Sequence, residues 1–142
     1  MGRVIDFWDI IGLSSAQSAD DVRSTLGRVS GRLGELAAAD LVKFFERLHE
    51  ALNGLDRGEL AEIPVFVRGQ EWPQSSDHFL YARCACVLAG RDAYDASLRS
   101  SSEFARFVQT FFQTAEELLS LAPAVHERRV GREMDMVGGP TP

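Results

Sequence analysis

The stretch from Asp77 to Leu98 reads DHFLYARCACVLAGRDAYDASL and decides the fold. Its first half is an almost wholly apolar helix that contains one charged residue, Arg83, and Asp77 is a suitable N-cap for it. Gly90-Arg91 ends this helix, and a second short helix follows. A helix that is apolar on all sides is buried inside a domain. The segment therefore predicts an all-α fold with residues 77–89 as its central helix.

Helical spacing of apolar residues continues on the N-terminal side of this segment. We expect a short helix over residues 4–13, a longer helix capped by Ser18, and a third helix from about residue 39 to Asn53-Gly54. Gly27 and Gly31 each weaken the second of these helices by up to about 1 kcal/mol relative to alanine. Either a neighbouring backbone approaches closely at both glycines, or this helix is mobile.

The rest of the chain is expected to be helix and loop. A helix over residues 56–63 ends at Pro64, the run 65–67 is read as irregular or as a last turn, and residues 69–76 form the main loop. No pair of strands is predicted. After the serines at 100–102, one long final helix ends at Pro123, and its wide apolar stripe forms either the wall of the bundle or a surface for a partner. This stripe comprises Phe104, Phe107, Val108, Phe111, Phe112, Ala115, Leu118, Leu119 and Ala122.

Length and composition indicate one domain. With 142 residues, of which 45% are hydrophobic, the chain can bury one sizeable core and is short for two. We expect a single-domain orthogonal helical bundle of about six to seven helices over residues 1–134. A disordered tail over residues 135–142 is expected to follow it.

Charge and hydropathy exclude several classes of partner. The net charge of −6 gives no basic face for nucleic acid. No apolar run approaches the roughly 20 residues that a membrane span needs, and Asp6 and Asp9 are unlike a signal peptide. We therefore expect a cytoplasmic protein with neither a nucleic-acid nor a membrane partner.

The cysteines and histidines predict no metal site or cofactor. Cys84 and Cys86 lie two residues apart on a helix and thus point in different directions, so they are read as unpaired buried thiols. His49, His78 and His126 have no metal-ligand spacing. No paired general acid and base, phosphate loop or nucleophile elbow is recognisable either, so enzymatic activity is uncertain and is not favoured.

Several of these segments together carry a family resemblance. The order of Phe79-Leu80, Arg83, Val87-Leu88, Gly90-Arg91 and Tyr94 resembles the core of the bacterial domain-of-unknown-function family numbered 4240. The N-terminal Phe7-Trp8-x-x-Ile11, the Phe44-Phe45 helix and the closing Val125-x-Glu127-x-x-x-Gly131 are similar to the same family. The resemblance implies an all-helical cytosolic bacterial protein and no particular activity, substrate or cofactor.

Two groups of residues are candidate sites. Asp77, Arg83, Arg91 and Tyr94 gather polar groups around the central helix, where the two arginines would hold a carboxylate or phosphate of a small ligand. Alternatively, Asp77 is a cap, Arg91 fills a helix end, and the guanidinium of Arg83 meets an internal carboxylate or a cluster of carbonyls.

The second candidate is Trp72-Pro73, because a tryptophan in a polar loop is a frequent anchor of protein interfaces. The sequence thus favours a non-catalytic module that binds a protein or peptide, or regulates one. The alternative is a small-molecule-binding protein, or a small enzyme of a bacterial pathway such as one for specialised metabolites, with an anion pocket around Arg83 and Arg91.

Overall fold

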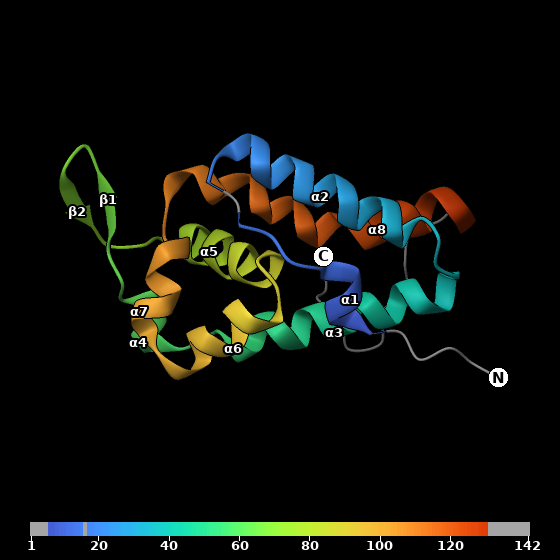
Figure 1. Cartoon of the computed structure of the whole chain (residues 1–142), viewed down its shortest axis with the longest axis horizontal. Helices are drawn as coiled ribbons and strands as arrows, with labels where there is room; N and C mark the ends of the chain where they lie inside the picture. The colour runs from blue at the N-terminus through green and yellow to red at the C-terminus, as the bar shows by residue number, and fades with distance from the viewer. Residues whose placement is uncertain (1–5, 16, 131–142) are drawn as a thin grey trace.

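The computed structural model describes residues 6–15 and 17–130 of the chain, and this part is predominantly helical (Figure 1). Its elements are α1 (Phe7–Ile11), α2 (Ala19–Leu33), α3 (Ala38–Gly54), α4 (Gly58–Ala61), β1 (Val65–Val67), β2 (Gln70–Trp72), α5 (Ser76–Leu88), α6 (Arg91–Arg99), α7 (Ser101–Phe104), the 3₁₀ helices η1 (Ala105–Phe107) and η2 (Thr110–Glu117), and α8 (Leu118–Val130). The predicted all-α class is confirmed. The predicted tail at 135–142 lies outside the described residues.

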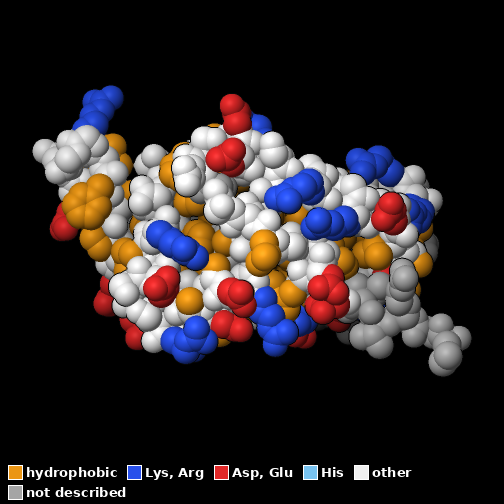
Figure 2. Space-filling view, in the orientation of Figure 1, with side chains coloured by type: hydrophobic (Ala, Val, Ile, Leu, Met, Phe, Trp, Pro, Cys, Tyr) orange, Lys and Arg blue, Asp and Glu red, His pale blue; other side chains and the backbone are white. Residues whose placement is uncertain are grey.

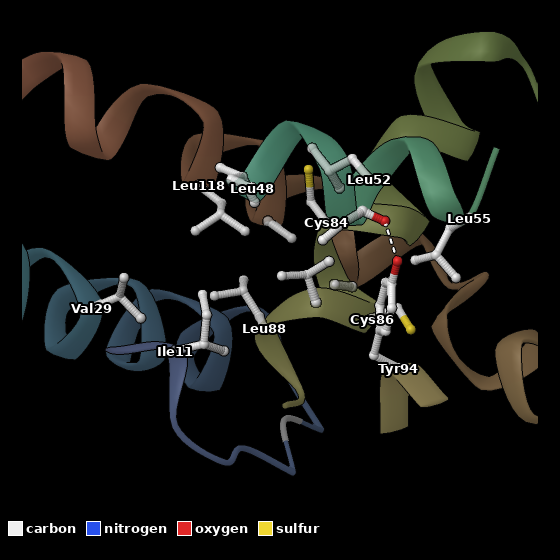
Figure 3. Packing of buried hydrophobic residues seen from close by; sticks show 14 of the residues in the cluster. Ile11, Val29, Leu48, Leu52, Leu55, Cys84, Cys86, Leu88, Tyr94 and Leu118 are labelled. Atoms are coloured by element: carbon white, nitrogen blue, oxygen red, sulfur yellow. Dashed lines mark hydrogen bonds between the residues drawn. The ribbon is translucent and has the colours of Figure 1, made fainter. Parts of the chain in front are cut away.

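The central position of α5 follows from its composition. Figure 1 shows α2 and α8 side by side along one edge and α3 along the other, with α5 between them, and α5 contacts η2, α3 and α8. Side chains on all sides of α5 are buried: Phe79, Ala82, Cys84, Ala85, Cys86, Val87 and Leu88. Figure 3 shows Cys84, Cys86 and Leu88 among apolar side chains from the surrounding helices. The prediction of a buried central helix is therefore confirmed.

Of two predicted helix caps, one is confirmed and one is wrong. The Ser18 hydroxyl accepts a hydrogen bond from the Asp21 N–H at 3.2 Å, as predicted. The prediction for Asp77 is wrong, because the Ser75 hydroxyl accepts the corresponding bond from the His78 N–H at 3.0 Å and α5 begins at Ser76. Asp77 instead lies exposed in the first turn of α5, where its negative charge interacts favourably with the positive end of the helix dipole.

The glycines fall into two groups. A Cβ atom added to Gly27 or Gly31 of α2 would meet no atom within 4 Å, so the first of the two alternatives, a close approach of a neighbouring backbone, is excluded. Gly90, between α5 and α6, has a φ of +110°, and its Cβ would lie 2.8 Å from the Gly12 carbonyl oxygen. Only glycine fits this turn, because both the backbone conformation and the contact exclude a side chain.

Residues 65–72 form a β-hairpin, so the prediction of irregular structure and loop is wrong here. Val65 pairs with Trp72, Phe66 with Glu71 and Val67 with Gln70 in antiparallel register. The two connecting residues, Arg68 and Gly69, have φ values of 52° and 78°. Two left-handed residues are characteristic of a type I′ turn. Strands of three residues and an Arg-Gly turn carry too little signal to predict this hairpin from the sequence.

The predicted single final helix is divided into α7, η1, η2 and α8. The chain leaves helical conformation at Val108 and Gln109, where ψ is 65° and 144°. Pro123 lies inside α8 and does not end it. Most of the predicted apolar stripe is nevertheless buried, with Phe111 and Leu119 only half-buried, so these residues form the wall of the core. Within residues 6–15 and 17–130, no helix combines the length and apolarity that crossing a membrane requires.

Candidate functional site

Two of the four residues predicted around the central helix meet the C-terminal turn of α3. The Tyr94 hydroxyl donates a hydrogen bond to the Ala51 carbonyl oxygen at 2.7 Å, which is the dashed line in Figure 3. The Arg83 Nη1 atom donates to the neighbouring Leu52 carbonyl oxygen at 3.3 Å. Carbonyls in the last turn of a helix lack partners within the helix. Tyr94 and Arg83 therefore act as side-chain caps of α3.

The guanidinium of Arg83, a half-buried residue, also contacts an aromatic ring. It lies over the Phe79 ring at 4.5 Å from the ring centroid, a cation–π arrangement. Its Nε atom is buried and has no hydrogen-bond partner among the described residues. None of the ion pairs within the described residues includes Arg83. A carbonyl and an aromatic ring thus meet this cation, whereas the sequence left open a carboxylate, a carbonyl cluster or a ligand.

Asp77 and Arg91 lie at the surface. The Arg91 Nε atom is 3.8 Å from the Asp95 Oδ2 atom, and the two side chains are 67% and 46% exposed. Burial raises the pKa of the Tyr94 hydroxyl, which keeps it protonated and able to donate. In the part of the chain that the structure describes, no hydrogen bond or ion pair joins any two of Asp77, Arg83, Arg91 and Tyr94. The structure brings only Arg83 and Tyr94 to adjacent carbonyls.

The other candidate, Trp72-Pro73, lies on the hairpin and just after it. Figure 1 shows the hairpin standing out from the helical body, and Figure 2 shows hydrophobic side chains exposed on it. Phe66 is 62%, Trp72 53% and Val67 38% exposed, while Val65 is buried. Pro73 is exposed as well. The sequence thus identified one exposed aromatic residue of the hairpin. The structure adds Phe66, which lies on the opposite face from Trp72, because Trp72 pairs with Val65 and successive strand residues alternate faces.

The register of the hairpin determines which peptide groups face outward. In an antiparallel pair, residues alternate between pairs that exchange both backbone hydrogen bonds and pairs that exchange none. The two residues that flank a two-residue turn, here Val67 and Gln70, form a bonded pair, so Phe66 and Glu71 form a non-bonded pair. The N–H and C=O groups of Phe66 therefore point to the free edge of β1, and those of Glu71 point to the free edge of β2.

A cavity of about 410 Å³ lies between the Ser14–Ser15 segment, α2, the end of α5 and the η1–η2 region. Its apolar lining includes Val22, Leu88, Phe107, Phe111 and Phe112. Its polar lining includes Ser14, Gln17, Thr25, Arg106 and Gln109. Sequence reasoning missed this cavity because the residues come from distant segments. The break at Val108-Gln109, which was predicted to be helical, contributes part of its wall.

Burial shifts the pKa values of both thiols and of two histidines. Cys84 and Cys86 are unpaired and buried, as predicted, and burial raises the pKa of each thiol to about 12. Burial lowers the pKa of His49 and that of His78. His49 packs against the Phe45 ring with 4.5 Å between ring centroids and is half-buried.

Comparison with known proteins gives a family and no activity. No curated protein and no solved structure shows a significant match to the chain. One family model, described as protein of unknown function (DUF4240), matches residues 3–128. This range includes the central helix, the hairpin and every residue named above as lining the cavity, in agreement with the resemblance of residues 77–98. The chain belongs to the DUF4240 family.

Proposed function

We propose that this protein is a non-catalytic module that binds an extended segment of another protein along the β1 edge of its hairpin. The observation that carries the proposal is the exposure of Phe66 and Trp72 on an element that projects from the helical body. Large aromatic side chains contribute more to interfaces than other residues do, and an apolar surface left in water favours association.

The hairpin has little other structural purpose. Of its strand residues only Val65 is buried, and a two-stranded hairpin is at best marginally stable alone in water. A third strand would pair the outward peptide groups of Phe66 and would cover apolar side chains. Such a partner strand stabilises the hairpin as it binds.

Charge favours the β1 edge over the β2 edge. The strand residues of β1, Val65, Phe66 and Val67, are all uncharged, whereas the central residue of β2 is Glu71. A proline flanks each strand, Pro64 before β1 and Pro73 after β2, so only the charge distinguishes the two edges. Charged residues and proline are the features that protect strand edges from pairing. The expected partner segment is therefore extended, with an uncharged, apolar residue opposite Phe66.

The alternative of a small anionic ligand held by Arg83 and Arg91 has less support. The Arg83 guanidinium and the Tyr94 hydroxyl both donate to carbonyls of α3, and Arg91 is exposed beside Asp95. A ligand at this place would have to displace those hydrogen bonds.

Photocrosslinking in the native host tests the proposal. A benzoylphenylalanine at position 66 is compared with one at Leu13, which is 70% exposed and lies outside the hairpin. We expect position 66 alone to give a defined adduct, and mass spectrometry then identifies the crosslinked segment. Equal labelling from position 13 would argue against the hairpin as the binding surface.

Direct binding measurements with the identified partner then distinguish binding at the β1 edge from binding at the β2 edge. In Trp8→Phe, Trp72 is the only tryptophan and reports binding by fluorescence. Phe66→Pro and Glu71→Pro each remove an outward N–H without removing a hydrogen bond between the strands. We expect Phe66→Pro to weaken binding at least about tenfold and Glu71→Pro to leave it within about twofold. The reverse order, or equal effects, would contradict strand addition to β1.

A further inference from the structure

The cavity between α2, α5 and the η1–η2 region has the size of a small-molecule site. Its volume of about 410 Å³ is near the lower end of the roughly 300–1,000 Å³ found for ligand pockets. Leu88 of α5 and Phe107 and Phe112 of the η1–η2 region line it, and all three are buried. A compact ligand fits this volume.

Arg106 gives the cavity its charge. It is the only charged residue among the described residues that line the cavity, and the chain as a whole carries a net charge of −6. Arg106 is exposed, and its guanidinium lies over the Phe107 ring at 4.9 Å from the ring centroid, which places the cation beside the apolar lining. No ion pair within the described residues includes Arg106. An anion is therefore the complementary ligand, and a single cation suits a monoanion better than a phosphate dianion.

The other residues that line the cavity favour a ligand with an aromatic ring. Phe111 is half-buried at the cavity, and its ring centroid is 4.3 Å from that of Phe112. A ligand ring placed here can stack on the exposed part of Phe111 and remove it from water. Gln17 and Gln109 add amide donors and acceptors at the same cavity, which can orient a polar group.

We propose that this cavity binds a compact aromatic monocarboxylate, with its carboxylate paired to Arg106 and its ring packed against Phe107, Phe111 and Phe112. The site is separate from the hairpin surface and does not depend on the proposed partner. It is also separate from the predicted Arg83 cluster, because neither Arg83 nor Arg91 lines it.

Calorimetric titration of the full chain with phenylacetate, phenylacetamide and octanoate tests this proposal. Phenylacetate and phenylacetamide share the ring and differ in charge, and octanoate keeps the charge on a linear chain. The variants are Arg106→Gln and, as a control with the same change of charge, Arg99→Gln on the exposed end of α6. Unchanged melting temperatures show that both variants fold.

We expect phenylacetate to bind more tightly than either analogue. Arg106→Gln should weaken phenylacetate at least about tenfold and leave phenylacetamide unchanged, because a charge-assisted pair is lost only for the carboxylate. Arg99→Gln should change phenylacetate binding by less than about twofold, as expected for a distant exposed charge. Amide signals of Ala89 and Gln109, which line the cavity, should shift on titration.

Any of four results would overturn the proposal. Equal binding of phenylacetate by Arg106→Gln and the wild type would show that the carboxylate does not pair with Arg106. Tighter binding of octanoate than of phenylacetate would show that the cavity does not prefer an aromatic ring. Absence of phenylacetate binding to the folded wild type at millimolar concentration would show that the cavity does not bind this ligand. Amide shifts confined to residues outside the cavity would show that phenylacetate binds elsewhere.

Discussion

The Tyr94 hydroxyl donates to the Ala51 carbonyl oxygen across 43 residues of chain. The Leu55 N–H, which would bond to Ala51 in a continuing helix, bonds to the Leu52 carbonyl oxygen at 3.2 Å. Tyr94 on α6 thus replaces a backbone donor that the end of α3 lacks. Because Arg83 caps the adjacent carbonyl, helices α5 and α6 both hold the last turn of α3.

Tyr94→Phe should lower the free energy of unfolding by about 1–2 kcal/mol. The substitution keeps the ring and leaves the Ala51 carbonyl without its side-chain donor. Urea unfolding followed by circular dichroism measures the loss. Tyr81→Phe, at a half-buried tyrosine with no side-chain hydrogen bond among the described residues, should change stability by less than about 0.5 kcal/mol. Equal losses in the two variants would contradict a specific cap.

Gly54→Ala should destabilise the protein by about 1–3 kcal/mol, although alanine favours helices, because its Cβ would collide with the Tyr94 hydroxyl. The same substitution at Gly31, where a Cβ meets open space, should raise stability by up to about 1 kcal/mol. Chemical denaturation of both variants measures whether each substitution lowers or raises the free energy of unfolding. A stabilising Gly54→Ala would show that Tyr94 can move away without cost.

The two residues should also be coupled. Tyr94→Phe removes the oxygen that the methyl group added in Gly54→Ala would meet, so the double variant should lose less stability than the sum of the two single losses. A double-mutant cycle with the same denaturation assay measures this coupling. Strict additivity would mean that the contact at Gly54 does not limit the packing of α6.

Arg83→Ala should cost about 1–2 kcal/mol, less than a buried ion pair would, because a carbonyl and the Phe79 ring surround the guanidinium. Arg83→Met keeps the apolar stem and should recover part of that loss. Arg91→Ala, at an exposed side chain, should stay within about 0.5 kcal/mol of the wild type. A strong dependence of the Arg83→Ala loss on salt concentration would instead indicate a carboxylate partner.

Alkaline pH should destabilise the fold through its thiols. Burial raises the pKa of Cys84 and Cys86 from 9.0 to about 12, so the folded state holds protons that the unfolded state releases. Their contribution to stability is complete below pH 9 and is lost as the pH rises from 9 towards 12. Denaturation at several pH values between about 8 and 11 measures this slope.

The variant Cys84→Ala/Cys86→Ala is the control for the alkaline effect. Its stability should fall less steeply above about pH 9, and the slope that remains reports other groups, including Tyr94, whose pKa burial also raises. An unchanged slope would show that the thiols do not titrate on unfolding in this range. In the wild type, thiol reagents at about pH 8 should label both cysteines only after unfolding.

Periodic burial made the helices predictable. The apolar residues of α3 repeat at helical spacing, and all of α5 is apolar except a few positions, so both helices and their burial follow from the sequence. The same rule failed in the aromatic segment, because Phe107 and Phe112 face the core on either side of a backbone break that apolar spacing does not record. The cavity depends on that break and could not be predicted.

Competition between similar local signals explains the other differences. Ser75 and Asp77 are both good caps two residues apart, and the sequence does not decide between them. The partner of Arg83 is a carbonyl 31 residues earlier, which carries no side-chain signature. Arg68 adopts a left-handed turn that glycine or asparagine normally marks, and the hairpin that exposes Phe66 was therefore missed.

The hairpin is nearly separate from the core, since only Val65 of its strands is buried. Its opening therefore requires little free energy compared with global unfolding, and its amide protons should exchange with solvent long before those of α5. Mutations at its exposed strand positions likewise leave the helical framework almost untouched. Evolution can consequently lengthen, shorten or recode this element in different lineages, while the bundle beneath it stays the same.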